Sequence, residues 1–266
     1  MYAFDYTRAS SLKEAAKLGT NEDAKYLAGG HTLLPTMKQR LASPGQIIDL
    51  GGLAELRGIE RSPRGVTIGA MTTYAEVVDS ADVREAIPAL AEMTSLVGDP
   101  AVRHRGTIGG SIANNDPAAD YPAACLALSA TIQTNQRKIA AEDYFQGLFT
   151  TALQEGEIIT KVSFQIPQKA GYMKFRNPAS RYALVGVFVA KRADGPRVAV
   201  TGAGADGVFR WTEAEEALKK RFASSSLEGL KHPTEGLNSD IHADAAYRAH
   251  LIGVMARRAV DAATER

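Results

Sequence analysis

Residues 105–120 read RGTIGGSIANNDPAAD, a stretch that combines three glycines, short hydroxyl and amide side chains, and two carboxylates. Such a stretch offers hydrogen bonds to a sugar, a phosphate and a polar ring edge together. Because residues 103–110 also break helical periodicity, we expect a ligand-binding loop here. The alternative is that Asp120 only caps the helix expected over residues 121–130, which is a frequent use of aspartate.

A second glycine-containing stretch, LAGGHTLLP, occupies residues 27–35. It follows a strand expected at residues 25–28 and precedes a helix expected at residues 33–41, with Pro35 marking the helix start. Two adjacent glycines let the backbone turn sharply and point successive N–H groups at phosphate oxygens. The stretch therefore predicts a diphosphate-binding turn, and the alternative is an ordinary glycine turn.

The pattern around these stretches predicts a small βαβ lobe followed by a larger mixed lobe. Ser11 and Glu14 indicate a helix over residues 11–18 that begins with a capping box. The other expected helices cover residues 73–97 with a break at Pro88, 121–130 and 141–149, and the other expected strands cover residues 46–50, 65–70, 130–134 and 157–166.

The last hundred residues predict a separate, smaller layered domain. Strands are expected at residues 172–176, 183–190 and 198–202, and helices at residues 213–222 and 243–263. We therefore expect an α+β fold with a domain at residues 1–168, whose lobes cover about 1–54 and 55–168, and a C-terminal domain with an antiparallel sheet and helices at residues 169–266.

Composition excludes several classes of function. The 266 residues are 45% hydrophobic and 23% charged, which is typical of a globular protein. Lys and Arg total 31 against 30 for Asp and Glu, so no global field attracts nucleic acid or an anionic membrane. The N-terminus does not resemble a secretory signal and no apolar run approaches about 18 residues, so we expect a cytoplasmic protein without a membrane span.

Metal chemistry is not expected in this chain. Cys125 is the single cysteine and the five histidines are scattered, so the sequence shows neither an iron–sulfur nor a zinc ligand pattern. Residues 202–207, GAGADG, match a dinucleotide-binding fingerprint. The residues after them are strand-like instead of helical, so this match predicts only a turn.

Three stretches together resemble the medium, FAD-binding subunit of the xanthine dehydrogenase and carbon monoxide dehydrogenase family over essentially the whole chain. They are AGGHTLLP at residues 28–35 with Met37-Lys38, TIGG at 107–110 with DPAAD at 116–120, and KFR at 174–176 with RYA at 181–183. The resemblance implies a two-lobed FAD domain of the vanillyl-alcohol oxidase type and a C-terminal domain of the carbon monoxide dehydrogenase flavoprotein type. The chain departs from the family at Ser111, often asparagine, and at Asn114-Asn115, often histidine-alanine.

By this resemblance, the first glycine stretch wraps the FAD diphosphate, and the second contacts the diphosphate and the flavin side. Asp120 contacts the sugar and adenine end, while Lys174 and Tyr182 lie beside the isoalloxazine ring. The implied cofactor-binding residues are Ala28, Gly29, Gly30, His31, Thr32, Leu33, Val97, Thr107, Gly109, Gly110, Ser111, Asn114, Asp120, Ile159, Lys174 and Tyr182. No histidine or cysteine stands where relatives attach FAD covalently, so non-covalent binding is implied, and no catalytic acid or base is assigned.

The resemblance further implies an oxidoreductase, namely a molybdenum hydroxylase built from several subunits. A large subunit would carry the molybdenum cofactor and a small one the 2Fe-2S clusters, in a dimer of heterotrimers, and this chain would pass electrons to an external acceptor. One alternative is a self-contained flavin oxidase or dehydrogenase of the same fold. Another is a protein that binds FAD only to stabilise an assembly or to sense redox state.

Overall fold

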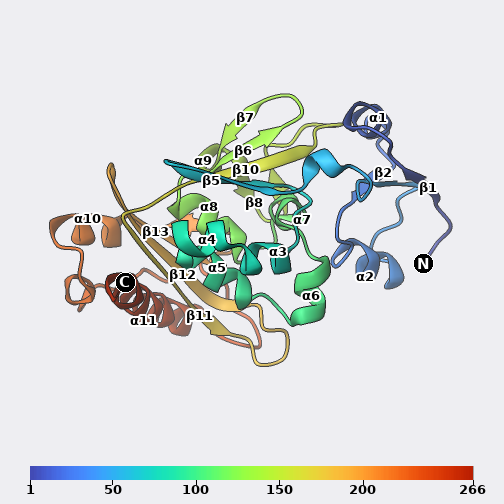
Figure 1. The fold of residues 1–266 in the computed structure, drawn as a ribbon. Helices are drawn as coiled ribbons and strands as arrows, with labels where there is room; N and C mark the ends of the chain where they lie inside the picture. The colour runs from blue at the N-terminus through green and yellow to red at the C-terminus, as the bar shows by residue number, and fades with distance from the viewer. Residues whose placement is uncertain (266) are drawn as a thin grey trace.

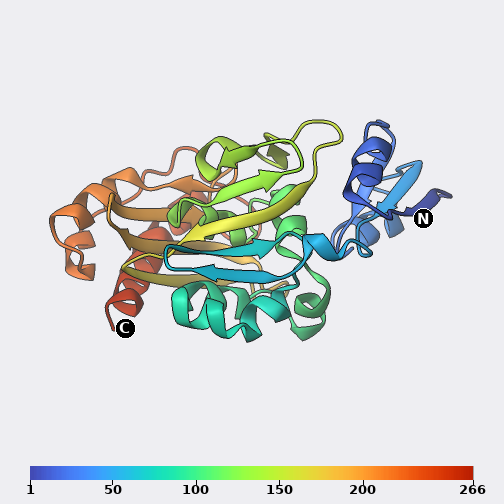
Figure 2. The same ribbon diagram turned by 45° about the horizontal axis from the view of Figure 1, so that its top comes forward.

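The computed structural model describes residues 1–265. It is an α+β protein in which three sheet-containing parts follow one another along the chain, as the colours of Figures 1 and 2 show. The N-terminal lobe stands at one end of the molecule, the C-terminal sheet lies at the other, and the second lobe lies between them. The predicted fold class is confirmed.

The N-terminal lobe contains a three-stranded parallel sheet in the order β1-β3-β2. Its elements are β1 (Asp5–Arg8), α1 (Leu12–Leu18), β2 (Ala24–Leu27), α2 (Leu33–Lys38) and β3 (Gln46–Asp49). Ser11 caps α1 by accepting from the Glu14 N–H, as predicted. The capping box is incomplete, because the Glu14 carboxylate accepts from the backbone and hydroxyl of Ser10 instead.

The second lobe contains an antiparallel sheet in the order β4-β5-β10-β6-β7. Its strands are β4 (Ile59–Ser62), β5 (Gly65–Gly69), β6 (Thr131–Thr134), β7 (Lys138–Ala140) and β10 (Ile159–Gln165), preceded by the 3-10 helix η1 (Ala54–Leu56). Its helices are α3 (Tyr74–Asp79), α4 (Ala81–Ala86), α5 (Pro88–Ser95), α6 (Pro100–Arg105), α7 (Ile108–Asn114), α8 (Tyr121–Ala127) and α9 (Ala141–Tyr144). A short hairpin of β8 (Phe145–Gly147) and β9 (Thr150–Thr151) follows α9.

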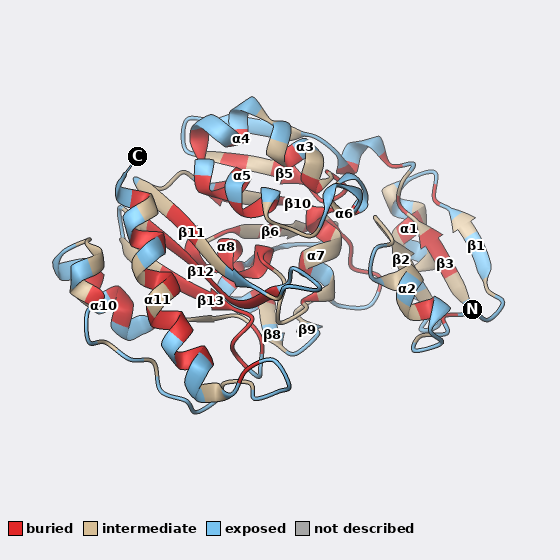
Figure 3. Ribbon diagram, turned by 90° about the horizontal axis from the view of Figure 1, so that it is seen from below, coloured by how far each residue is buried: buried red, intermediate tan, exposed pale blue. Residues whose placement is uncertain are grey.

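The C-terminal part is an antiparallel sheet with one long helix on its outer face. Its elements are β11 (Lys169–Arg176), β12 (Ala183–Arg192), β13 (Gly195–Thr201), β14 (Phe209–Arg210), α10 (Thr212–Lys220), η2 (Ser224–Leu227) and α11 (Ala245–Thr264). The buried side of α11 faces β11–β13 in Figure 3. Tyr172 and Phe188 on the opposite face join the apolar core of the second lobe, so the sheet is covered on both sides.

Residues 103–110 are not the loop that broken periodicity predicts, because α6 and α7 cover most of them. Asp99 caps α6 by accepting from the Val102 N–H, and Pro100 occupies its first turn. Thr107 caps α7 by accepting from the Gly110 N–H. Helices of six and seven residues make fewer than two turns, which is too short to display a periodic apolar face.

The helix expected at residues 141–149 ends at Tyr144, and the β8–β9 hairpin replaces its second half. Gly147 has φ 137° and Phe149 has φ 51°, so the chain reverses direction at this tip. The helix expected at residues 33–41 likewise ends early, at Lys38, because Arg40 takes a left-handed conformation with φ 61°.

The turn expected at residues 202–207 joins β13 to β14, with Gly202 at φ 82°. Since a strand and not a helix follows, the dinucleotide fingerprint has no βαβ unit around it. Within residues 1–265, no helix is long and apolar enough to cross a membrane.

Candidate functional site

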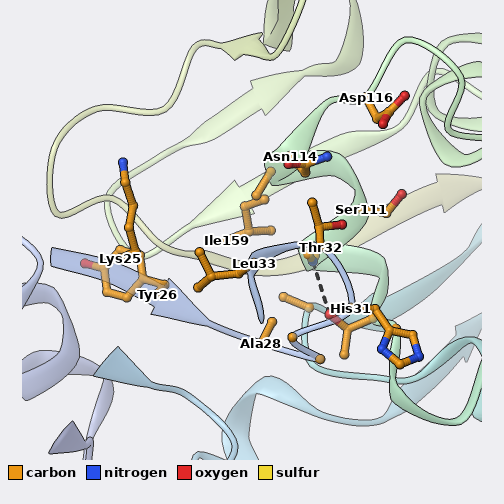
Figure 4. A pocket seen from close by; sticks show the side chains of 18 of the residues that line it. Lys25, Tyr26, Ala28, His31, Thr32, Leu33, Ser111, Asn114, Asp116 and Ile159 are labelled. Carbon is orange, nitrogen blue, oxygen red and sulfur yellow. Dashed lines mark hydrogen bonds between the residues drawn. The ribbon is translucent and has the colours of Figure 1, made fainter. Parts of the chain in front are cut away.

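A cleft of about 830 Å³ runs between the N-terminal lobe and the second lobe, and the loop between β11 and β12 closes part of one side. Figure 4 shows Lys25 and Tyr26 toward one end of this cleft and Ser111 and Asp116 toward the other. The volume lies in the upper part of the range of about 300–1,000 Å³ usual for small-molecule sites. All three parts of the fold therefore contribute to a single ligand-sized space.

The loop between β2 and α2, residues 28–33, forms one wall of the cleft. In the described part of the chain, the N–H groups of residues 29–33 donate no hydrogen bond to any protein acceptor. Gly30 adopts φ 76°, a left-handed conformation that glycine takes at little cost. A run of unpaired N–H groups beside a left-handed residue suits a phosphate-rich ligand.

The two glycine-containing stretches lie against each other. A Cβ built on Gly29 would come within 1.9 Å of the Arg105 carbonyl oxygen, and one on Gly110 would lie 3.5 Å from the Ala28 Cβ. His31 adds a side-chain contact, since its Nε2 lies 3.2 Å from the Ala101 carbonyl oxygen. The first lobe thus touches the second across the cleft at α6 and α7, and both stretches can face one ligand.

The glycines of α7 serve close packing more than ligand hydrogen bonding. The Gly109 N–H donates to the Ala70 carbonyl, and the Gly110 N–H to the Thr107 hydroxyl. A Cβ on Gly109 would lie 2.6 Å from the Ala70 Cβ. Both N–H groups already donate to protein acceptors. The absence of a side chain at each glycine is what allows α7 to pack closely against its neighbours.

Asp120 is buried on the cleft wall and held by two groups of β11. Its carboxylate accepts from Lys174 Nζ at 3.0 Å and from the Tyr172 hydroxyl. Lys174 also donates to the Leu96 carbonyl at 3.1 Å, and its side chain is fully buried. Asp120 stands at the N-cap position of α8 but makes no side-chain cap, so the alternative capping interpretation is wrong.

Burial raises the pKa of two groups that line the cleft. Burial raises the pKa of the Asp116 carboxyl above its ordinary value. Burial also raises the pKa of Tyr182, with further contributions from the negative charges of Asp116 and Asp120. Tyr182 remains neutral across the physiological range and keeps its hydroxyl proton.

The structure brings nearly all of the predicted cofactor residues together. From Ala28 to Leu33, and at Val97, Thr107, Gly109, Gly110, Ser111, Asn114, Asp120, Ile159 and Tyr182, they line the cleft. Lys174 does not reach its surface, because its ammonium lies behind Asp120. The residues could hold FAD: unpaired N–H groups suit a diphosphate, and half-buried or exposed aromatic rings suit planar groups.

Sequence reasoning missed part of the wall. Lys25, Tyr26 and residues 153–158 line the cleft beside Ile159, and Phe149 reaches it from the β8–β9 tip. The sequence carries no local signal for most of them, because they come from a strand and two loops that meet only in the folded chain. Among residues 1–265, no cluster of three His, Cys, Asp or Glu side chains could hold a metal ion.

Comparisons with known proteins identify the family of this chain. A family model described as the FAD binding domain in molybdopterin dehydrogenase matches residues 2–169. The chain is 34% identical to the carbon monoxide dehydrogenase medium chain of Afipia carboxidovorans over 99% of this chain and 98% of the relative. It is 35% identical to the glyceraldehyde dehydrogenase medium chain of Sulfolobus acidocaldarius over 96% of each chain.

Among solved structures, a chain of the reconstituted CO dehydrogenase from Oligotropha carboxidovorans superimposes with a TM-score of 0.90. The two chains are 33% identical, and the match covers 100% of this chain and 99% of the other. The family match, the full-length relatives and the shared fold lead to one assignment. This chain belongs to the family of FAD-binding domains in molybdopterin dehydrogenases, as an FAD-binding oxidoreductase subunit.

Proposed function

We propose that this chain is the FAD-bearing medium subunit of a molybdenum hydroxylase, taking electrons from the 2Fe-2S clusters of a partner and passing them to an external acceptor. The observation that carries this proposal is the run of unpaired N–H groups at residues 29–33, packed against α6 and α7 in one cleft. When bound, FAD supplies an electron carrier that this chain's own side chains do not provide.

In this proposal, each part of the cleft has one task toward a non-covalently bound FAD. Residues 28–33 hold the diphosphate, and Thr107, Gly109, Gly110 and Ser111 form the opposite wall of the cleft. Asp120 accepts from a sugar hydroxyl, while Lys174 positions Asp120 and balances its charge. Tyr182 shields the isoalloxazine side at the mouth, and Val97, Asn114 and Ile159 pack around the cofactor.

The partners belong to the same proposal. The similar proteins from Afipia and Sulfolobus are named medium chains, which suggests larger and smaller companions. We propose a large subunit with the molybdenum cofactor and a small 2Fe-2S subunit, in a dimer of heterotrimers. We also propose that the FAD-binding domain ends near residue 168, which is supported by the end of β10 at Gln165 and the start of β11 at Lys169.

Purification of the chain from its native host tests the proposal. We expect a yellow complex with one FAD per chain and companion chains that contain molybdenum and iron. Substrate should bleach the flavin only when those companions are present. A lone yellow chain that oxidises an organic substrate would instead establish the self-contained oxidase. A flavin that resists reduction within the assembled complex would point to a structural or sensing role.

A further inference from the structure

The tip of the β8–β9 hairpin is fastened by one buried side chain of the second lobe. Asn115 Nδ2 donates to the Gly147 carbonyl at 2.9 Å and to the Thr150 carbonyl at 2.8 Å. These two anchor points flank Phe149, which lines the cleft although the residue is 57% exposed. Asn115 itself lies outside the cleft lining and is only 2% exposed, so it can act on the cleft only through the hairpin.

Stability does not account for this arrangement. Within the described residues, Asn115 Oδ1 is buried without a hydrogen-bond partner, a penalty comparable to the net gain from both Nδ2 bonds. Phe149 at φ 51° is also strained, because residues with a Cβ other than Asn and Asp seldom adopt the left-handed region. Phe149 is also a large apolar residue that stays exposed to solvent. Local costs of this kind persist where a precise geometry serves a site.

We propose that Asn115 is a positioning residue, which holds the β8–β9 tip so that the Phe149 ring forms an apolar wall against a planar ring of bound FAD. The proposal rests on the proposed function. An aromatic ring offers a flat apolar surface to a heterocycle, and such contacts favour stacked or edge-on geometries. Asn115 suits its task because asparagine tolerates the left-handed conformation, here φ 44°, and its amide can donate to two carbonyls at once.

The test uses the complex as isolated from its host, stripped of flavin and titrated with FAD. Phe149→Ala removes the ring, and Asn115→Gly removes the two amide bonds while keeping a residue at ease with positive φ. The matched control is Leu148→Ala, which removes an exposed apolar side chain of the same tip that does not line the cleft. The double variant Asn115→Gly/Phe149→Ala decides whether the two residues act together.

We expect Phe149→Ala and Asn115→Gly each to weaken FAD binding about tenfold, which corresponds to about 1.4 kcal/mol. The double variant should bind no more weakly than Phe149→Ala alone, and Leu148→Ala should bind like the wild type. Hydrogen exchange at residues 145–151 should accelerate in Asn115→Gly. Titration with FMN identifies the ring: a parallel loss of FMN affinity indicates the isoalloxazine, and a loss confined to FAD indicates the adenine.

Three results would overturn the inference. The first is FAD affinity within twofold of wild type in Phe149→Ala, and the second is independent, multiplying losses in the double variant. A fall in melting temperature without a change in FAD affinity would assign Asn115 a purely structural role and would also refute it. Failure of the wild-type complex to bind FAD would instead remove the proposed function itself, so the two failures are distinguishable.

Discussion

The contact between Gly29 and α6 makes Gly29→Ala the most direct test of the cleft. The added Cβ would lie 1.9 Å from the Arg105 carbonyl oxygen, 2.7 Å from its carbonyl carbon and 3.1 Å from the Gly106 Cα. All three neighbours are backbone atoms, so no side chain can rotate away. Since real Cβ contacts essentially never fall below 3.0 Å, the two segments must separate by about 1 Å.

That separation sets the size of the effect. Forcing a methyl group into packed structure costs about 1–3 kcal/mol, so the free energy of unfolding should fall by that amount. The same movement displaces the N–H groups of residues 29–33 from the opposite wall. Because a hydrogen bond to a charged acceptor contributes about 1.5–3 kcal/mol, losing one should weaken FAD binding about tenfold or more.

Urea unfolding and flavin titration measure the two effects separately. The matched control is Gly45→Ala in the same lobe, where the nearest atom to a new Cβ is the Asp23 Cβ at 3.5 Å, an ordinary contact. It should leave both quantities near wild type. Wild-type stability and FAD affinity in Gly29→Ala would show that the two lobes do not meet as described, and would refute the reasoning about the cleft.

Lys174→Met leaves the buried Asp120 carboxylate without its cation, so the free energy of unfolding should fall by about 3–5 kcal/mol in urea titrations. Unchanged stability would contradict the paired state of Asp120. Burial alone would raise the pKa of Glu157, but bonds from Arg137, Thr134 and the Gln154 N–H hold it below the ordinary 4.5. The stability that Glu157 contributes is present above pH 4.5, and it is lost as pH falls through the lower pKa that Glu157 has in the folded state. Glu157→Gln should therefore make the melting temperature depend less on pH in that acidic window. An unaltered pH dependence would exclude the Arg137–Glu157 pair as its cause.

Local signals in the sequence predicted the elements whose geometry is set within a few residues. The Ser11 cap, the turn at Gly29-Gly30 and the turn at Gly202 all appear where glycine and capping preferences place them. The strand β1 was missed, because its four residues alternate poorly and it forms only by pairing with β3. Likewise β4 depends on its partner β5 more than on its own polar sequence.

The parts of the site that escaped prediction depend on contacts between distant segments. Lys174 was predicted to lie beside the flavin; the structure adds that its ammonium donates to Asp120 and to the Leu96 carbonyl, and nothing in the KFR stretch indicates that pairing. The bonds from Asn115 to the β8–β9 tip join residues more than thirty positions apart. A glycine-rich stretch indicates where the backbone can approach a ligand. The side chains that form the cleft wall, in contrast, depend on contacts between segments that are distant in the sequence.

The segment 96–101, which joins α5 to α6 and includes the first two residues of α6, contacts both the C-terminal part and the first lobe. Its carbonyls accept from Lys174 and Arg181 of the C-terminal part, and the Ala101 carbonyl lies within hydrogen-bond distance of His31 of the first lobe. Val97 of the same segment lines the cleft. The N-terminal lobe and the C-terminal part therefore both contact this one short segment of the second lobe. Weakening the contacts made by Arg181 and His31 should change the cleft before it unfolds a domain, so FAD affinity is a more sensitive measure of these two contacts than melting temperature.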